Sequence, residues 1–516
     1  MSSLYREFIC ELRRLKWLPG FSVFIITFLW FGFFALGDAD AHHDGIMFKP
    51  AADMAAGQVL FRDSFTQYGL LTTWIQSIAI RIFGEQLIWV RFSAVFFYAL
   101  SAVFLLKIWR AVLPGLWCFG VILLFWALPG FYLEKFCFLP WSSVYALFFF
   151  LLTAYFLLSA VRHDSMLSWV MASCAGALTF WCRQPGGLAL AAGGGLAILL
   201  TIWRPAALPD RCRFRILVFA LSGFFFLLLP LLYLLINGAI EDWYIQSLRF
   251  AFRFEESKHQ ISVFDLFPIL SVYGIFPLIM LAYSMIALIR VLRNKASSRD
   301  CFLLCLAAVS AASWFQYYPV GCERHLYWAG VPMFGFYVLM LFDLTLYKKH
   351  RVLVLVLLGI MAFFPLPEII IRADGVLWYV ETFSQRRSFK EGPLKGSFLF
   401  SEDYANWEKL SVLFAEVPVE LQKKPYVNFT ADALVCLYFP NRSNLHPMYV
   451  NWGDQVYDDY SEKIHRLILK YNPVVYNRAS YRPPFSSRFM VLPEDDGKNF
   501  QYFDLSPNGQ PFGVMR

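Results

Sequence analysis

Eleven stretches of the sequence are long and apolar enough to cross a membrane as helices. A membrane span needs about 20 mostly apolar residues. Soluble domains carry about 25% charged residues, whereas charged residues make up 16% of this 516-residue chain. We therefore expect an integral membrane protein with an all-α polytopic domain. The predicted spans cover residues 18–36, 89–108, 115–133, 141–160, 166–182, 187–203, 216–236, 266–289, 301–320, 327–347 and 352–371.

Basic residues mark one side of the membrane. When the N-terminus is placed in the cytoplasm, every short inside loop is basic, as the positive-inside rule requires. These loops hold Lys107 and Arg110; Arg162; Arg204, Arg211, Arg213 and Arg215; Arg290, Arg293, Lys295 and Arg299; Lys348, Lys349 and Arg351. The net charge of +8 therefore does not indicate nucleic-acid binding. The loop at 37–88 and the chain after about residue 372 are predicted to lie outside.

The composition changes at about residue 372, where charged residues, Pro and Asn become frequent and no further span follows. Short apolar runs that alternate with helical patterns predict a small α/β domain. The runs are Ser397–Phe400, Tyr426–Phe429 and Pro473–Tyr476, and the clearest helical pattern is Tyr460–Leu469. We expect a transmembrane domain over 1–371 and a soluble extracytoplasmic α/β domain over 372–516.

The first outside loop opens with an acidic and histidine-rich cluster, Gly37-Asp38-Ala39-Asp40-Ala41-His42-His43-Asp44-Gly45. Its position directly after a span places it at the membrane–water boundary. Residues Ile46 to Ala56 then predict a short helix that stops at Gly57, and apolar residues between Leu70 and Ile82 recur with helical spacing. Amphipathic helices of this kind lie in the interface plane. The loop is therefore predicted to form two interfacial helices that bracket a polar pocket.

The outside face carries the residue types that sugar transfer from a lipid phosphate requires. A carboxylate must deprotonate the acceptor, and cationic groups must hold the departing phosphate. The candidate bases are Asp38, Asp40, Asp44 and Asp63, and the candidate phosphate-binding residues are Lys49, Arg62, Arg183, Arg324 and His325. Arg183 and the Arg324-His325 pair lie at membrane edges, where a charge is costly and usually has a partner or a function.

Some of these residues also have plainer interpretations. Asp38 and Asp40 would then be solvated residues at the end of a helix, whereas Lys49 and Arg91 would pair with nearby acids or reach the lipid headgroups.

A metal site is the other chemistry that the cluster allows. His42, His43 and Asp44 are candidate ligands because zinc takes imidazole and carboxylate groups, although two adjacent histidines do not easily turn both rings to one ion. The ten Cys residues show no Cys/His spacing typical of a structural zinc site.

The loop resembles that of membrane glycosyltransferases with the GT-C fold that use polyprenyl-phosphate sugars, similar to protein mannosyltransferases and the aminoarabinose transferases of lipid A. In that family an acidic pair opens the loop, followed by a helix, a glycine, an acidic residue and an aromatic-rich turn. The matching residues are His43-Asp44-Gly45, Gly57, Asp63 and Tyr68-Gly69. The resemblance covers roughly residues 17–371.

The resemblance implies a role for each matched residue. Asp44 takes the place of the catalytic carboxylate, but the usual Asp-Glu pair is His43-Asp44 here, so Asp40 stays open as the base. The implied supporting residues are His43, Asp63 and Tyr68, with Glu134 at the position of a second acidic residue. Arg324-His325 resembles the segment that meets the donor phosphate, and Arg183 and Lys49 remain candidate phosphate-binding residues from their charge and position. The implied enzyme lies in the bacterial inner membrane and takes a polyprenyl-phosphate sugar as donor and a glycan, lipid or protein as acceptor. Use of a divalent metal ion stays open.

The alternative is a transporter or flippase of lipid-linked sugars. Such a protein is expected to carry buried charges near mid-span and repeated halves, and the sequence shows neither. A structural membrane subunit would leave the acidic loop unexplained. The transferase hypothesis predicts that Asp44→Asn abolishes transfer and leaves the protein folded.

Overall fold

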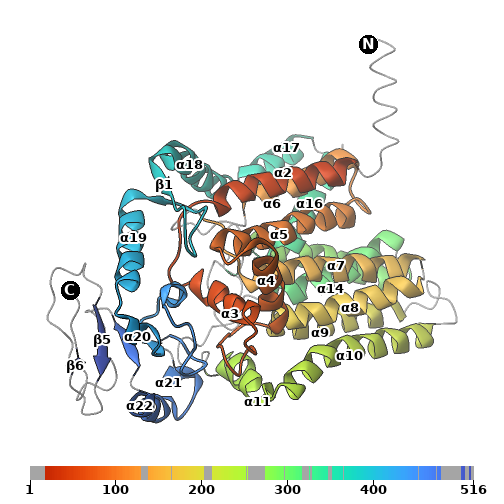
Figure 1. Cartoon of the computed structure of the whole chain (residues 1–516). Helices are drawn as coiled ribbons and strands as arrows, with labels where there is room; N and C mark the ends of the chain where they lie inside the picture. Colours follow the sequence, from red (N-terminus) through yellow and green to blue (C-terminus); the bar gives the residue numbers. More distant parts are fainter. Residues whose placement is uncertain are drawn as a thin grey trace. The chain divides into compact units, whose positions relative to one another are not determined.

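The computed structural model divides into two compact units, each assembled from separate stretches of the chain (Figure 1). The first, here the helical unit, combines Met1–Ala35, Ala94–Leu228 and Ile261–Val380, and the second, here the mixed unit, combines Leu36–Ser93, Leu229–Gln260 and Glu381–Arg516. The structure describes residues 18–128, 137–163, 165–202, 212–251, 253, 274–295, 297–315, 325, 328–346, 351–363, 365–450, 453–471, 473–477, 501–505 and 511–512.

Apolar helices make up the helical unit. Within the described residues, five segments are long and apolar enough to cross a membrane: Leu18–Ala35 (α2), Leu87–Trp109 (α5), Ser142–His163 (α7), Phe214–Ile236 in α10 (Cys212–Ile236) and Ile275–Leu292 (α13). The other helices are α6 (Gly115–Ala127), α8 (Met166–Cys182), α9 (Gln184–Ile202), α14 (Ser298–Trp314), η5 (Val331–Met333), α16 (Phe334–Leu346), α17 (Arg351–Phe363) and α18 (Leu366–Thr382). Each of the eleven predicted spans overlaps one of these helices. That all eleven cross the membrane, and in which direction, stays a prediction.

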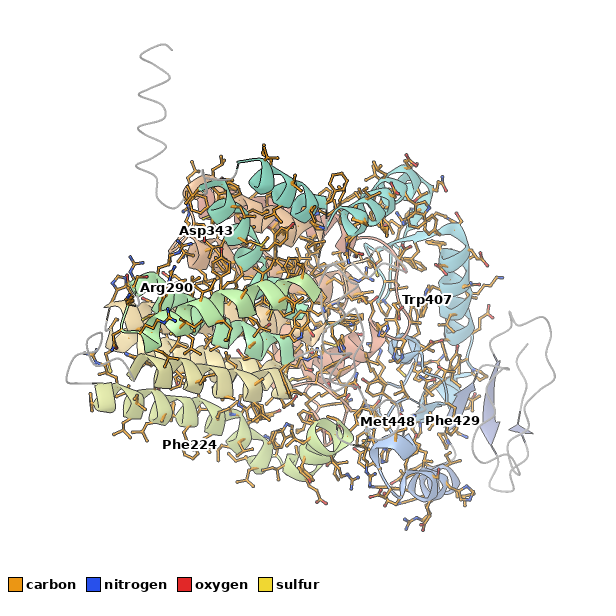
Figure 2. The ribbon with its side chains drawn as sticks, turned by 180° about the vertical axis from the view of Figure 1, so that it is seen from behind. Phe224, Arg290, Asp343, Trp407, Phe429 and Met448 are labelled. Atoms are coloured by element: carbon orange, nitrogen blue, oxygen red, sulfur yellow. The ribbon has the colours of Figure 1, made fainter. Side chains whose placement is uncertain are left out.

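The helices of this unit differ in how much apolar surface they leave uncovered. Helix α7 is mostly buried against its neighbours, whereas α10 contains an 18-residue apolar window in which no residue is buried. Phe224, labelled on α10 in Figure 2, is 61% exposed. An uncovered apolar helix is expected where lipid takes the place of protein neighbours, so α10 has the character of a lipid-facing helix.

Ion pairs join the ends of α13, α14 and α16. Arg290 contacts Asp300 at 3.0 Å and Arg299 contacts Asp343 at 2.9 Å; Arg290 and Asp343 are labelled in Figure 2. Ser297 caps α14 in a capping box with Asp300, which satisfies backbone N–H groups that would otherwise lack a partner.

The mixed unit contains short helices and all the described strands. Its helices are α3 (Gly45–Ala55), α4 (Leu70–Phe83), α11 (Ile240–Trp243), the π-helix η2 (Tyr244–Arg249), η6 (Phe383–Gln385), α19 (Ser401–Ala415), α20 (Val419–Gln422), η7 (Ala433–Tyr438), α21 (Gly453–Val456) and α22 (Tyr460–Tyr471). One core joins the loop at 37–88 to the C-terminal segment, because Phe48 and Ala52 of α3 pack in the same cluster as Leu399 and Leu434.

The strands form two small sheets. Strands β1 (Arg386–Ser388) and β2 (Phe398–Phe400) are antiparallel. The second sheet has the order β3-β4-β5-β6, in which β3 and β4 are parallel and the other pairs are antiparallel. Its strands are β3 (Tyr426–Asn428), β4 (Val474–Asn477), β5 (Gln501–Leu505) and β6 (Pro511–Phe512). The three apolar runs predicted to be strands are strands, whereas a separate domain over 372–516 stays a prediction.

Helix α3 is buried along ten of its eleven residues, Gly45–Met54. Because η7 and α4 both pack against it, α3 exposes no apolar face of its own; its place in the membrane interface stays a prediction. Helix α4 fits that expectation better, since Trp74, Ile78 and Ile82 remain exposed on it.

Gly45 is required where η7 meets the start of α3. A Cβ atom at this position would lie 2.1 Å from the backbone nitrogen of Leu434, whose N–H donates to Ala41 O at 3.0 Å. We expect Gly45→Ala to lower the melting temperature measured in detergent. Gly194→Ala in α9 is the control, because nothing lies within 4 Å of its Cβ position; equal melting temperatures for the two variants would contradict this.

Candidate active site

The acidic turn, residues 37–44, joins α2 to α3 and is fixed by the C-terminal segment. Asp38 N donates to Phe398 O, and Phe398 N donates to Leu36 O, both at 2.8 Å. Gly37 and Phe398 thus form a parallel bridge that extends the β1–β2 hairpin. The turn is held by backbone pairing to a strand and is not a free loop.

Asp44 is the most enclosed carboxylate of the turn. Both Asp44 and Arg91 of α5 have fully buried side chains, and they form a two-pronged ion pair: Arg91 Nε lies 3.0 Å from Oδ1 and Nη2 lies 2.6 Å from Oδ2. Arg91 Nη1 also donates to Gly37 O at 2.7 Å, and Asp40 N donates to Asp44 Oδ2 at 2.8 Å. The pair ties both ends of the turn to α5.

Asp40 organises the middle of the turn. Its Oδ1 accepts the backbone N–H groups of His42 at 3.0 Å and His43 at 2.6 Å. Asp40 is 8% exposed and Asp38 is 4% exposed. The interpretation of these two acids as solvated residues is therefore wrong, because the neighbouring strand and helices cover them.

The candidate metal ligands of the turn do not converge. Arg91 occupies both oxygens of Asp44, and His42 Nδ1 lies 2.8 Å from Ala431 O. His43 packs edge-to-face on His42, with 4.9 Å between ring centroids. Among the residues that the structure describes, no group of three or more His, Cys, Asp or Glu side chains is arranged to hold a metal ion.

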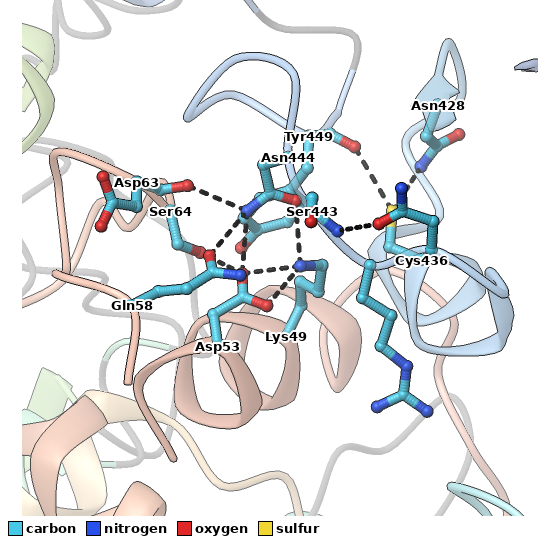
Figure 3. A network of polar contacts seen from close by, with 12 residues as sticks. Lys49, Asp53, Gln58, Asp63, Ser64, Asn428, Cys436, Ser443, Asn444 and Tyr449 are labelled. Atoms are coloured by element: carbon cyan, nitrogen blue, oxygen red, sulfur yellow. Dashed lines mark hydrogen bonds and ion pairs between the residues drawn. The ribbon is translucent and has the colours of Figure 1, made fainter. Parts of the chain in front are cut away.

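Lys49 belongs to a buried polar network (Figure 3). Its ammonium lies 2.5 and 2.6 Å from the two oxygens of Asp53, one turn further along α3, and 3.0 Å from Asn444 Oδ1. Asp53 Oδ2 also accepts Ser64 Oγ at 2.6 Å and Asn444 Nδ2 at 3.0 Å. Lys49 and Arg91 are therefore ion-paired, as the plainer interpretation had it. A phosphate-binding Lys49 would first have to leave Asp53.

Asp63 and Tyr68 lie further along the same loop. Asp63 receives both Arg62 Nε and Nη2, at 2.8 and 2.9 Å, and the backbone N–H of Val59 at 2.8 Å. The hydrogen bond from Arg62 holds the pKa of the Asp63 carboxyl below its ordinary value. Tyr68 is half-buried, and its N–H donates to Thr66 Oγ1. Their supporting roles stay predictions.

Arg183 and His325 belong to the helical unit. Arg183 follows α8, and its Nη1 donates to Ser143 Oγ of α7. His325 is half-buried. Arg324 and Glu134 lie outside the described residues. The donor-phosphate site thus stays a prediction.

Two residues that the sequence reasoning missed hold the mixed unit together. Arg386 of β1 contacts Asp38. Gln246, in the π-helix, donates to Phe61 O and Tyr457 Oη, each at 2.6 Å, and accepts Thr66 N at 3.2 Å. For Arg386 the only hint in the sequence is the general excess of basic residues outside the spans. No sequence pattern predicts the role of Gln246.

Comparison with known proteins identifies the fold. No protein family and no curated protein matches the chain by sequence. Among solved structures, the chain is similar to the aminoarabinose transferase ArnT from Cupriavidus metallidurans bound to undecaprenyl phosphate, with TM-score 0.54, 12% identity and coverage of 89% of this chain and 92% of that one. The apo form of ArnT gives TM-score 0.52 and 11% identity over the same shares.

A second similar structure is the archaeal oligosaccharyltransferase AglB from Archaeoglobus fulgidus, in complex with an inhibitory peptide and a dolichol-phosphate. It has TM-score 0.50 and 12% identity, and the match covers 90% of this chain and 70% of that one. Both are GT-C proteins, so the GT-C fold predicted from the sequence is confirmed.

Proposed function

We propose that this protein is a membrane glycosyltransferase that moves a sugar from a polyprenyl-phosphate donor to an envelope glycan, lipid or protein. One observation carries the proposal: in a chain with the GT-C fold, three buried carboxylates, Asp38, Asp40 and Asp44, follow directly on the apolar helix α2. Buried acids are costly unless they are paired or functional. At the end of an apolar helix they can meet an acceptor beside a lipid donor.

The donor class follows from the ligands of the similar structures. ArnT is bound to undecaprenyl phosphate and AglB to a dolichol-phosphate. Transfer leaves the donor's phosphate with an additional negative charge, and cationic side chains stabilise such a leaving group. Arg324, His325 and Arg183 are the proposed phosphate-binding residues. Lys49 is the weaker candidate, because Asp53 and Asn444 already surround its ammonium.

The base comes from the acidic turn. The resemblance favours Asp44, with Asp40 as the second choice. However, Arg91 and the Asp40 N–H already occupy the oxygens of Asp44. Asp44 is therefore better placed to position the turn than to accept a proton from an acceptor.

The test is a mass-spectrometric comparison of envelope glycans and polyprenyl-linked sugars in the wild-type strain, a deletion strain and the complemented strain. We expect one sugar to disappear from one glycan on deletion, its polyprenyl-phosphate donor to accumulate, and both to recover on complementation. Purified protein in proteoliposomes should then release polyprenyl phosphate as that sugar is transferred. Movement of intact donor across the bilayer without release would favour a flippase instead.

A further inference from the structure

The Asp38 carboxylate has one oxygen without a hydrogen bond. Asp38 is 4% exposed, and its Oδ2 accepts Arg386 Nη2 at 3.2 Å. Among the buried carboxylate oxygens of the described residues, Oδ1 of Asp38 is the one that has no hydrogen-bond partner. A buried polar atom left unpaired destabilises a fold, so such an atom in a native protein requires an explanation, which is often a ligand or a catalytic role.

The backbone of Asp38 is also strained. Its φ is +50°, in the left-handed region that is uncommon for residues other than glycine, although Asp and Asn adopt it more often than most. The flanking peptides hold it there, because Asp38 N donates to Phe398 O at 2.8 Å and Gly37 O accepts Arg91 Nη1 at 2.7 Å. Strain of this kind is found most often at functional sites, where the surrounding structure fixes it.

Arg386 approaches Asp38 in a fixed orientation. Its guanidinium carbon lies 4.3 Å from the ring centroid of Phe400 and 5.8 Å from that of Phe383. Stacking on aromatic rings restricts a guanidinium group. In this orientation Arg386 donates a hydrogen bond to Asp38 Oδ2, so Asp38 Oδ1 remains available to a different donor.

Three other acids of the first loop, Asp44, Asp53 and Asp63, have hydrogen bonds to both carboxylate oxygens. Asp44 is bound through both oxygens by Arg91, and Asp53 is bound by Lys49, Ser64 and Asn444. Arg62 and Val59 occupy the oxygens of Asp63. Compared with these three carboxylates, Asp38 still has an oxygen, Oδ1, that can accept a proton.

We propose that Asp38, and not Asp44, is the general base of the proposed transfer reaction. This inference rests on the proposed function. The acceptor O–H or N–H gives its proton to Asp38 Oδ1, and the acceptor atom forms a bond to the anomeric carbon. The bond from that carbon to the phosphate oxygen breaks, and its electron pair leaves with the polyprenyl phosphate. Arg386 is a positioning residue that presents Oδ1 to the acceptor.

The charges around Asp38 act in opposite directions. Burial raises the pKa of the Asp38 carboxyl, Arg386 of β1 and Arg91 of α5 lower it, and Asp403 of α19 raises it; the net effect is a pKa above the ordinary value. A base with a raised pKa takes a proton more readily and still ionises as the pH increases. Transfer should therefore fall as the pH is lowered through this pKa.

The experiment uses membranes of the deletion strain, which contain the accumulated donor, to which purified wild-type or variant protein is added. Donor consumption is followed by mass spectrometry. Because general-base catalysis contributes about 10²–10⁴-fold, we expect Asp38→Asn to slow transfer by about that factor and to lose the acid limb of the pH profile. Asn tolerates the positive φ, but it leaves the buried Arg386 guanidinium without its charged partner. Transfer rates are therefore compared only for variant protein whose melting curve shows that it is folded. Arg386→Lys should move the acid limb to higher pH, because the guanidinium hydrogen bond that lowers the pKa is weakened.

Glu402→Gln is the matched control, since it makes the same acid-to-amide change at an exposed position in α19 and should transfer at the wild-type rate. If Asp38→Asn folds poorly, Asp38→Gly replaces it, because glycine adopts the positive φ without strain. Wild-type turnover in either folded Asp38 variant overturns the assignment of the base and leaves the proposed function intact. No consumption of any polyprenyl-linked sugar by the wild-type protein refutes the proposed function itself.

Discussion

Arg91→Met is expected to lower the unfolding free energy by about 3–5 kcal/mol, the usual cost of removing one partner of a buried ion pair. The variant leaves the Asp44 carboxylate uncompensated in a fully buried position. It also removes the donor to Gly37 O, so both ends of the acidic turn lose their connection to α5. Chemical unfolding in detergent, with folded yield from membranes as a second readout, measures the effect.

The double variant Asp44→Leu with Arg91→Met is the informative control. Replacing both members of a buried pair by apolar side chains is often neutral or stabilising, so the double variant should recover much of the lost stability. If Arg91→Met unfolds like the wild type, the pair is not a structural element. The sequence alone predicted that Asp44→Asn abolishes transfer and leaves the protein folded. By the same reasoning, the buried pair with Arg91 means that this variant should lower stability as well as activity.

Asp53→Ala is expected to have a comparable effect, about 3–5 kcal/mol. It leaves the Lys49 ammonium buried with Asn444 as its remaining hydrogen-bond partner, and it removes the acceptor that Ser64 and Asn444 share. Because Asn444 lies in the C-terminal segment, the variant should also loosen the attachment of α3 to that segment. Hydrogen exchange of the α3 amides, measured together with the melting temperature, would show it.

The chain provides a matched control for this experiment. Glu462 and Arg466 of α22 have the same four-residue spacing as Lys49 and Asp53, but their side chains are 75% and 66% exposed. Exposed pairs of this kind contribute about 0.2–1 kcal/mol, so Glu462→Ala should change the melting temperature little. Similar losses for Asp53→Ala and Glu462→Ala would contradict the distinction between the two pairs.

The sequence predicted the elements of this fold better than their surroundings. The length of the apolar stretches predicted α2, α5 and α7, and the short apolar runs predicted β3 and β4. Both predictions succeed because these signals are local in the sequence. Burial of α3 was not predictable in the same way. Its cover comes partly from η7, almost 400 residues later in the chain, and no local pattern specifies that contact.

The candidate site shows the same limit. The cluster of acids was visible, and so was the need for cationic partners. The sequence did not show which acid pairs with which cation. Asp44 pairs with Arg91 on the next long helix, whereas Asp38 pairs with Arg386, 348 residues away. The carboxylate with an unpaired oxygen can be recognised only after all the other pairs are known.

The bridge between Gly37 and Phe398 has a consequence for biogenesis. Helix α2 is synthesised early, yet the turn that follows it obtains its backbone partner only when β2 emerges, after every helix of the helical unit. Until then Asp38 lacks the backbone partner that holds it in its buried position. A ribosomal product that stops before Phe398 would lack this backbone pairing, and with it the partner that fixes the start of the acidic turn.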